Sequence, residues 1–249
     1  IGERVLVRSM QQYAVDYRPF EFWTVGSECD GAFAQYMVAF ADESYKIESN
    51  WSDIELASIP CAYSTAENLI ERSNVKKGEI VLITGASGGV GSAAIQLAKR
   101  RGAIVIAVVS KEKINEVQKI GADTIINRDD SLLSILGKEH VDVVIDLVAG
   151  KNWGELLDVL KRGARYASSG AIAGPMVELD IRTLYLKDLT LIGCTFQERQ
   201  VFENLIGYIE RNEIKPLLAK SYPLSEIIDA QKDFLSKKYV GKLVLIPFH

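Results

Sequence analysis

The sequence predicts an α/β protein built on a doubly wound parallel sheet, and three observations point to this fold class. Between residues 77 and 196, apolar runs of strand length alternate with amphipathic stretches of helix length. The strand-length runs are apolar throughout, which is typical of parallel strands covered by helices on both faces. A glycine-rich turn over residues 85–91 joins the first of these strands to the first helix.

The elements follow one another in strict βα alternation. The predicted strands of the sheet are 80–84, 104–109, 124–126, 141–145, 165–169 and 189–196. The helices predicted between them are 92–101, 111–120, a short one containing Leu132, Leu133 and Leu136, and 153–160. Gly102 and Gly121 mark two of the helix ends, because glycine readily adopts the left-handed conformation that closes a helix.

The flanking segments are more polar and alternate in character. They predict strands at 4–7, 32–38 and 240–247 and a helix at 225–235. We therefore expect three segments: residues 1–63 and 197–249, which pair into a smaller β-rich domain, and residues 64–196, which form the parallel sheet.

Composition narrows the class of protein. The 249 residues are 48% hydrophobic and 25% charged, as in ordinary globular proteins, and the net charge is −4. An acidic chain lacks the basic footprint that nucleic-acid binding needs. No apolar run approaches the roughly 20 residues of a membrane span. The 3 cysteines form no C-x-x-C pair, which favours free thiols in a reducing, cytoplasmic compartment.

The glycine turn predicts a binding site for the phosphates of a dinucleotide. Its spacing is A-x-G-x-x-G, with Ala86, Gly88 and Gly91. Glycines at such a turn let a pyrophosphate approach the backbone amides, and the helix that follows supplies free N–H groups. The cofactor-binding residues expected here are Ser87, Gly88, Gly89, Val90 and Gly91.

The same turn also reads G-x-S-x-G, through Gly85, Ser87 and Gly89. That pattern is typical of the nucleophile elbow of serine hydrolases, so hydrolysis by Ser87 is an alternative. A hydrolase needs a histidine to activate the serine. His140 precedes a strand and His249 is the last residue, and both positions argue against this reading.

The end of the second strand of the sheet bears on the choice of cofactor. A protein that binds NAD usually carries an acidic residue there for the ribose hydroxyls. This chain has Ser110 and Lys111 instead, and Arg128 follows the third strand. A hydroxyl and two cations favour the 2′-phosphate of NADP(H), although Glu112 is close by.

Five segments resemble the medium-chain dehydrogenase/reductase superfamily, above all its zinc-type alcohol dehydrogenase-like and quinone oxidoreductase-like members. They are residues 2–7, 30–36, 85–91, 121–123 and 240–245. The resemblance implies a GroES-like catalytic domain, a Rossmann domain over 64–196, and a C-terminal segment that returns to the catalytic domain. It also implies that the N-terminal portion of the family's catalytic domain is missing from this chain.

The resemblance assigns roles to individual residues. Val90, Thr65, Gly170 and Ala171 match positions beside the nicotinamide, Ser110 occupies the position of the acidic residue at the adenosine ribose, and Lys242 resembles a basic residue near the phosphates. No residue stands out as a general acid. Tyr63 and Ser64 are weak candidates, and the catalytic residues stay unassigned.

Zinc is the point at which this sequence departs from part of the family. Members with a structural zinc carry four cysteines between the segments 2–7 and 32–36, where this chain has only Cys29. Cys61 occupies the place of one catalytic zinc ligand, and Cys194 lies in a predicted strand. A catalytic zinc needs three protein ligands, so a zinc ion is possible but a chain without one is favoured.

The sequence thus predicts an NADP(H)-dependent oxidoreductase that moves a hydride to or from a small carbonyl, alcohol or enone. The alternatives are a metal-free quinone or enone reductase and a protein that binds NADPH without catalysis. A homodimer or homotetramer is expected, because the strand over 190–196 would leave an open sheet edge.

Overall fold

The computed structural model describes residues 1–13, 18 and 20–247, and the chain divides into two compact units. Unit 1 comprises residues 1–64 and 196–249, and unit 2 comprises residues 65–195. None of the helices in the described part of the chain is long and apolar enough to cross a membrane.

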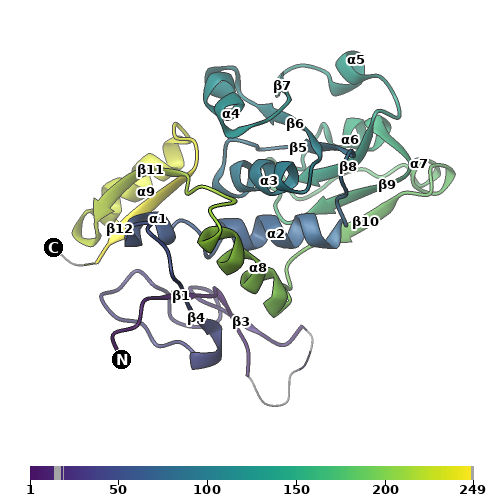
Figure 1. Ribbon diagram of the computed structural model, residues 1–249. Coiled ribbons are helices and arrows are strands. Elements are labelled where there is room, and N and C mark those ends of the chain that lie inside the picture. The colour runs from purple at the N-terminus through teal and green to yellow at the C-terminus, as the bar shows by residue number, and fades with distance from the viewer. Residues whose placement is uncertain (14–17, 19, 248–249) are drawn as a thin grey trace. The chain divides into compact units, whose positions relative to one another are not determined.

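Unit 2 is built on a 6-stranded, wholly parallel sheet (Figure 1). The strands lie in the order β10-β9-β8-β5-β6-β7. This order reverses direction between β5 and β8, as in the doubly wound fold that binds dinucleotides at that point. The strand bounds are β5 Ile80–Ile83, β6 Ile104–Val109, β7 Thr124–Asn127, β8 Val141–Asp146, β9 Leu160–Ser168 and β10 Thr190–Gly193.

Helices connect these strands, and local sequence sets their ends. Their bounds are α3 Gly89–Arg100, α4 Ile114–Ile120 with the 3₁₀ turn η2 Lys111–Lys113 before it, α5 Leu132–Leu136, α6 Trp153–Val159 and α7 Ile181–Leu186. Helix α3 carries Lys99 and Arg100 in its last turn, where cations complement the helix dipole. Helix α4 ends at Gly121, whose φ is +118°.

The core of unit 2 lies between the sheet and these helices. It contains Leu82, Ile106 and Val144 from the strands, and Trp153 and Leu156 from α6. Residues of β5 and β8 are buried over their whole length apart from Ile80 and Asp142. Their continuous apolar sequence is explained by this two-sided burial.

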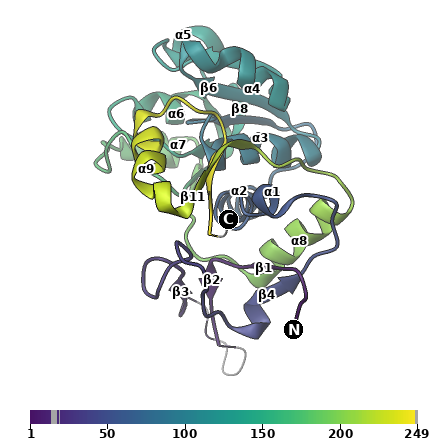
Figure 2. The same cartoon turned by 90° about the vertical axis from the view of Figure 1, so that its left-hand side faces the viewer.

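The described residues of unit 1 form three small two-stranded sheets, β1-β4, β2-β3 and β11-β12. Its elements are β1 Val5–Val7, β2 Met10–Gln11, β3 Trp23–Thr24, η1 Ala41–Glu43, β4 Ser44–Lys46, α1 Asp53–Leu56, α8 Arg199–Glu210, β11 Leu218–Pro223, η3 Leu224–Glu226, α9 Ile227–Ser236 and β12 Lys242–Ile246. Figure 2 shows α9 beside β11, with which it is in contact. Helix α2, Ala62–Arg72, begins in unit 1 and continues in unit 2.

A buried ion pair within residues 1–64 of unit 1 also contacts the second sequence segment of that unit. Arg8 and Glu43 are both fully buried, and Arg8 Nη1 lies 2.9 Å from Glu43 Oε2. Arg8 also donates to the carbonyl of Gln197, and Arg199 Nε donates to Glu43 Oε1 at 3.1 Å. Removing one partner of such a buried pair is strongly destabilising, and the Gln197 carbonyl and Arg199 add contacts from the 196–249 segment to it.

The fold class predicted from the sequence is confirmed, and most elements of unit 2 lie where they were expected. The predicted strand at 32–38 is wrong, because residues 32–40 form no helix or strand. Phe33, Tyr36 and Val38 are 69%, 82% and 98% exposed, so no strand among the described residues buries this apolar alternation. The assignment of unit 1 to a GroES-like catalytic domain stays a prediction.

Candidate functional site

The glycine turn lies at the carboxyl end of β5, where the strand order reverses. Gly85 has a φ of +58°, and Gly88 is the N-cap of α3. A Cβ added to Gly91 would lie 2.4 Å from the carbonyl oxygen of Gly85. Glycine at 91 therefore lets the first turn of α3 pack directly on the chain that leaves β5.

Gly88 has a different environment from Gly91. It is exposed, and a Cβ added to it would meet only the Gly85 oxygen, at 3.4 Å. Gly88 immediately precedes the first turn of α3, whose N–H groups have no acceptor within the helix. Helix α3 has 12 residues, and its positive end attracts anions. The turn thus fits the pyrophosphate of a dinucleotide.

The residues predicted to select the cofactor follow the carboxyl ends of β6 and β7. Val109 pairs with Asn127 in register, and the N–H of Arg128 donates to the Val109 carbonyl at 2.7 Å. Ser110 and Arg128 are therefore neighbours. Lys111 and Arg128 are exposed, and Ser110 is half-buried, so the three side chains are accessible to a phosphate.

Glu112 is the acidic member of this group. Its pKa is lowered by a hydrogen bond from its own backbone N–H, then by one from Ser110, and further by the charges of Arg128 and Lys111. The Ser110 hydroxyl is consequently engaged by a carboxylate. An incoming 2′-phosphate would compete with Glu112 for Ser110, Lys111 and Arg128.

The remaining predicted cofactor residues lie in different elements. Gly170 and the exposed Ala171 follow β9, and a Cβ on Gly170 would lie 2.9 Å from the carbonyl oxygen of Leu147. Thr65 is half-buried in α2. Lys242 belongs to unit 1, at the first position of β12. The turn, the β6–β7 ends and the β9 end share one edge of the unit 2 sheet, because parallel strands end on the same side.

The two weak candidates for a proton donor, Tyr63 and Ser64, both donate their hydroxyl hydrogens to backbone carbonyls. The hydroxyl of the fully buried Tyr63 donates to the Lys215 carbonyl, and that of Ser64 donates to the Pro60 carbonyl. As they stand, neither hydroxyl proton is available to a substrate.

The structure also bears on the hydrolase reading of Ser87. Ser87 follows the carboxyl end of β5, whereas His140 immediately precedes the amino end of β8. Because these strands are parallel neighbours, the two residues lie at opposite edges of the sheet. His249 lies outside the described residues. The sheet therefore offers Ser87 no histidine partner among the residues described.

The cysteines do not gather into a metal site. Among the described residues, no group of three or more His, Cys, Asp or Glu could hold a metal ion. Cys29 and Cys61 are exposed, and Cys194 is buried. Burial raises the pKa of the Cys194 thiol, as expected of an inert core cysteine.

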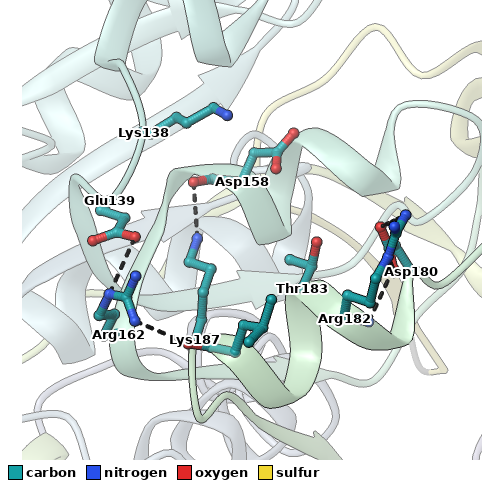
Figure 3. A pocket seen from close by; sticks show the side chains of 9 residues that line it. Lys138, Glu139, Asp158, Arg162, Asp180, Arg182, Thr183 and Lys187 are labelled. Atoms are coloured by element: carbon teal, nitrogen blue, oxygen red, sulfur yellow. Dashed lines mark hydrogen bonds and ion pairs between the residues drawn. The ribbon is translucent and has the colours of Figure 1, made fainter.

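A separate hollow of about 390 Å³ lies at the opposite edge of the sheet, beside the amino ends of β8 and β9 (Figure 3). Lys187 points across it and donates to the carbonyls of Leu157 and Asp158 at 2.8 and 3.0 Å. Arg162 pairs with Glu139 at 3.6 Å, and Arg182 with Asp180 at 3.1 Å. Ligands of parallel α/β sheets bind at the carboxyl ends of the strands, whereas this hollow lies at the amino ends. Its charged side chains bind one another or backbone carbonyls, so we do not assign it a ligand.

A buried cluster at the carboxyl edge was missed by the sequence analysis. Asp146, the last residue of β8, is fully buried and accepts hydrogen bonds from Thr84 and from Tyr166. Burial raises the pKa of the Tyr166 phenol, and the Asp146 carboxylate raises it further. The signal available in the sequence was an acidic residue at the carboxyl end of β8, a strand whose one other polar residue is Asp142 near its amino end.

These features define a dinucleotide-binding α/β protein, and comparisons with known proteins place it in a family. A family model described as zinc-binding dehydrogenase matches residues 89–211. The chain is 33% identical to an acryloyl-coenzyme A reductase of Metallosphaera sedula over 88% of its own length and 66% of that protein. It is 30% identical to a quinone oxidoreductase of Pongo abelii, over 88% and 70% of the two chains.

Solved structures agree with these relatives. A putative alcohol dehydrogenase from Sinorhizobium meliloti 1021 matches with a TM-score of 0.94 and 44% identity, over 100% of this chain and 70% of that one. A 2-octenoyl-CoA carboxylase reductase from a Streptomyces species, solved with NADP and 2-octenoyl-CoA, matches with a TM-score of 0.83 and 28% identity, over 92% and 57%. The chain belongs to the medium-chain dehydrogenase/reductase superfamily.

Proposed function

We propose that this protein is an NADP(H)-dependent oxidoreductase that transfers a hydride to or from a small carbonyl, alcohol or enone. The observation that carries the proposal is the turn at 85–91, in which the exposed Gly88 caps the start of α3 while Gly91 lets α3 pack closely on the chain that leaves β5. A bound nicotinamide supplies the hydride chemistry. The residues Ser87–Gly91 would hold the pyrophosphate, and Ser110, Lys111 and Arg128 would hold the 2′-phosphate.

The other predicted residues would orient the nicotinamide. Thr65, Val90, Gly170 and Ala171 are proposed to lie beside its ring, and Lys242 near the phosphates. Holding the ring at a fixed distance from the substrate is the main contribution that a protein makes to hydride transfer. The chain spans about two thirds of the acryloyl-coenzyme A reductase that it matches, so this activity is proposed for the protein to which these residues belong.

A metal-free reduction of a quinone or an enone is a second candidate. It is favoured by the names of two relatives, a quinone oxidoreductase and an acryloyl-coenzyme A reductase. We propose that zinc is not a structural component of this chain. A cytoplasmic location is also proposed, on the basis of its free thiols.

The test is oxidation of NADPH, followed by its absorbance, with a panel of a quinone, an enoyl thioester, an aldehyde and a ketone. Turnover with at least one of these substrates supports the oxidoreductase, and the substrate used distinguishes carbonyl from enone chemistry. NADPH binding without turnover of any of them would support the non-catalytic alternative. An activated ester serves as the control, because its hydrolysis, lost on Ser87→Ala, would support the hydrolase.

A further inference from the structure

The proposed function leaves unused a fully buried carboxylate at the carboxyl edge of the unit 2 sheet. Asp146 accepts a hydrogen bond from Tyr166 Oη at 2.6 Å and another from the Thr84 hydroxyl. Its Oδ1 also accepts the N–H groups of Val148 and Ala149, at 3.0 and 3.2 Å. All these neighbours are donors, so both carboxyl oxygens of Asp146 serve as hydrogen-bond acceptors.

The backbone that Asp146 holds is strained. Ala149 has a φ of +54°, a left-handed conformation that costs free energy for a residue with a Cβ. Such a conformation persists only where the surroundings impose it. Here the carboxylate supplies that constraint, because it accepts the amide of Ala149 itself and that of the residue before it.

The strained turn over 147–150 lies between two segments of the proposed cofactor site. On one side, the N–H of Leu147 donates to Thr84 Oγ1 at 2.9 Å, and a Cβ on Gly85 would lie 3.1 Å from Val148 Cγ2. On the other side, the carbonyl of Leu147 closely approaches Gly170, and the N–H of Ala173 donates to the Val148 carbonyl at 2.9 Å.

We infer that Asp146 is a positioning residue for the cofactor. It fixes the turn 147–150, and through that turn it sets the spacing between the glycine turn at 85–91 and the segment 168–173. The inference rests on the proposed function. It adds that the affinity for the dinucleotide depends on a carboxylate that is itself sealed inside the unit.

Asp142 offers a matched control on the same strand. It is also a hydrogen-bonded carboxylate, since it accepts the N–H of Ile80 at 2.8 Å and the ammonium of Lys161 at 2.9 Å. It lies at the amino end of β8, however, and touches neither segment of the proposed site. Asp142→Asn therefore perturbs the same strand without touching the turn.

The experiment compares the dissociation constant for NADPH in Asp146→Asn, Asp142→Asn and the double variant Asp146→Asn/Ala149→Gly. An amide at 146 has one acceptor oxygen in place of two, so the turn loses a constraint and Asp146→Asn raises the dissociation constant at least about tenfold. Asp142→Asn changes it less than about twofold. Glycine at 149 adopts the positive φ without strain, so the double variant recovers most of the lost affinity.

A second readout needs no cofactor. Amide hydrogen exchange over 147–150 and 168–173 should be faster in Asp146→Asn than in Asp142→Asn, with both proteins free of nucleotide. Thr84→Val removes the hydroxyl that links Asp146 to Leu147. If Asp146→Asn does not fold, NADPH affinity and hydrogen exchange are measured on Thr84→Val instead.

The outcomes separate the inference from the function on which it rests. Wild-type affinity in Asp146→Asn, an equal loss in Asp142→Asn, or no recovery in the double variant would each overturn the positioning role. If the wild-type protein binds neither NADPH nor NADH, the proposed function fails. The exchange comparison then still decides whether Asp146 orders the two segments.

Discussion

At the residue scale, Gly88 and Gly91 of the glycine turn have different roles: we expect substitution of Gly88 to affect cofactor binding and substitution of Gly91 to affect stability. Gly88→Val places a side chain where the protein leaves open space, in a backbone conformation (φ −73°, ψ 169°) that valine tolerates. We expect it to abolish NADPH binding and to lower the melting temperature less than Gly91→Ala does, because valine is a poorer N-cap than glycine but meets no close contact. Gly91→Ala creates a contact of 2.4 Å with the Gly85 carbonyl, and such overpacking costs about 1–3 kcal/mol of stability. Titration calorimetry and thermal unfolding of both variants check the contrast. Normal NADPH affinity in Gly88→Val would contradict the placement of the phosphates.

The preference for NADPH over NADH is decided by a few side chains at the ends of β6 and β7. Ser110→Asp adds a carboxylate where the 2′-phosphate is expected, so the ratio of NADPH to NADH affinity should fall by roughly ten- to a hundredfold. Glu112→Gln removes the anion that now engages Ser110, so the same ratio should rise by about threefold. Opposite shifts in the two variants are the required result, measured as dissociation constants at one fixed salt concentration because charge interactions are screened. Equal affinities for both cofactors in the wild-type protein would refute the preference.

At the scale of elements, Asp123 links α3 to the start of β6. It accepts the ammonium of Lys99 at 2.7 Å and the N–H of Val105 at 2.7 Å. Burial opposes ionisation of Asp123, but these donors outweigh it, and the pKa of Asp123 lies below its ordinary value of 3.8. A lowered pKa stabilises the folded state above about pH 3.8, and the stabilisation is lost as the pH falls through the folded-state value.

Asp123→Asn should therefore lower the free energy of unfolding at pH 7, by less than about 1 kcal/mol because the pair is partly exposed to solvent. The difference from the wild-type protein should shrink as the pH falls below 3.8. Urea unfolding at pH 7 and pH 3 tests this sign. A difference that grows toward acid pH would contradict the role of the carboxylate.

The elements of unit 2 were the most predictable part of the chain, for a physical reason. Strands such as 104–109, buried on both faces, have a continuous apolar sequence. Helix ends were predictable where glycine closes them, as at Gly121. Helix α3 begins at Gly89, three residues before the predicted start. The prediction assigned Gly89 and Gly91 to the turn because glycine disfavours helix interiors, but the backbone at both residues is helical.

The elements of unit 1 were less predictable, because its strands are short and each strand pairs with one that is distant in sequence. Residues 32–38 alternate as a strand would, yet a strand also needs a neighbour to accept its hydrogen bonds, and no local signal reports one. The pairing of Arg8 with Glu43 and Arg199 was invisible for the same reason. The glycine turn could be located from the sequence alone, whereas the Asp146 cluster depends on three strands meeting at one edge.

At the scale of the whole molecule, the open edge of the unit 2 sheet leads to a prediction about assembly. Strand β10 pairs with β9 and with no other strand in the described part of the chain. Leu191 on this strand is 37% exposed, and Ile181, Tyr185 and Leu186 on the preceding helix α7 are 57–59% exposed. An unpaired edge beside exposed apolar side chains is a liability that proteins cover. Two-fold pairing of β10 with a second copy would continue the sheet across both subunits.

We therefore expect a homodimer or a homotetramer at micromolar concentration, measured by light scattering coupled to gel filtration. Leu191→Lys places a charge on the proposed contact and should shift the mass toward the monomer. Ile135→Lys is the matched control, because Ile135 is 52% exposed on α5, away from the edge strand, and it should leave the mass unchanged. A monomer in the wild-type protein would count against the pairing. An oligomer that persists in Leu191→Lys would mean that subunits meet at a surface other than β10.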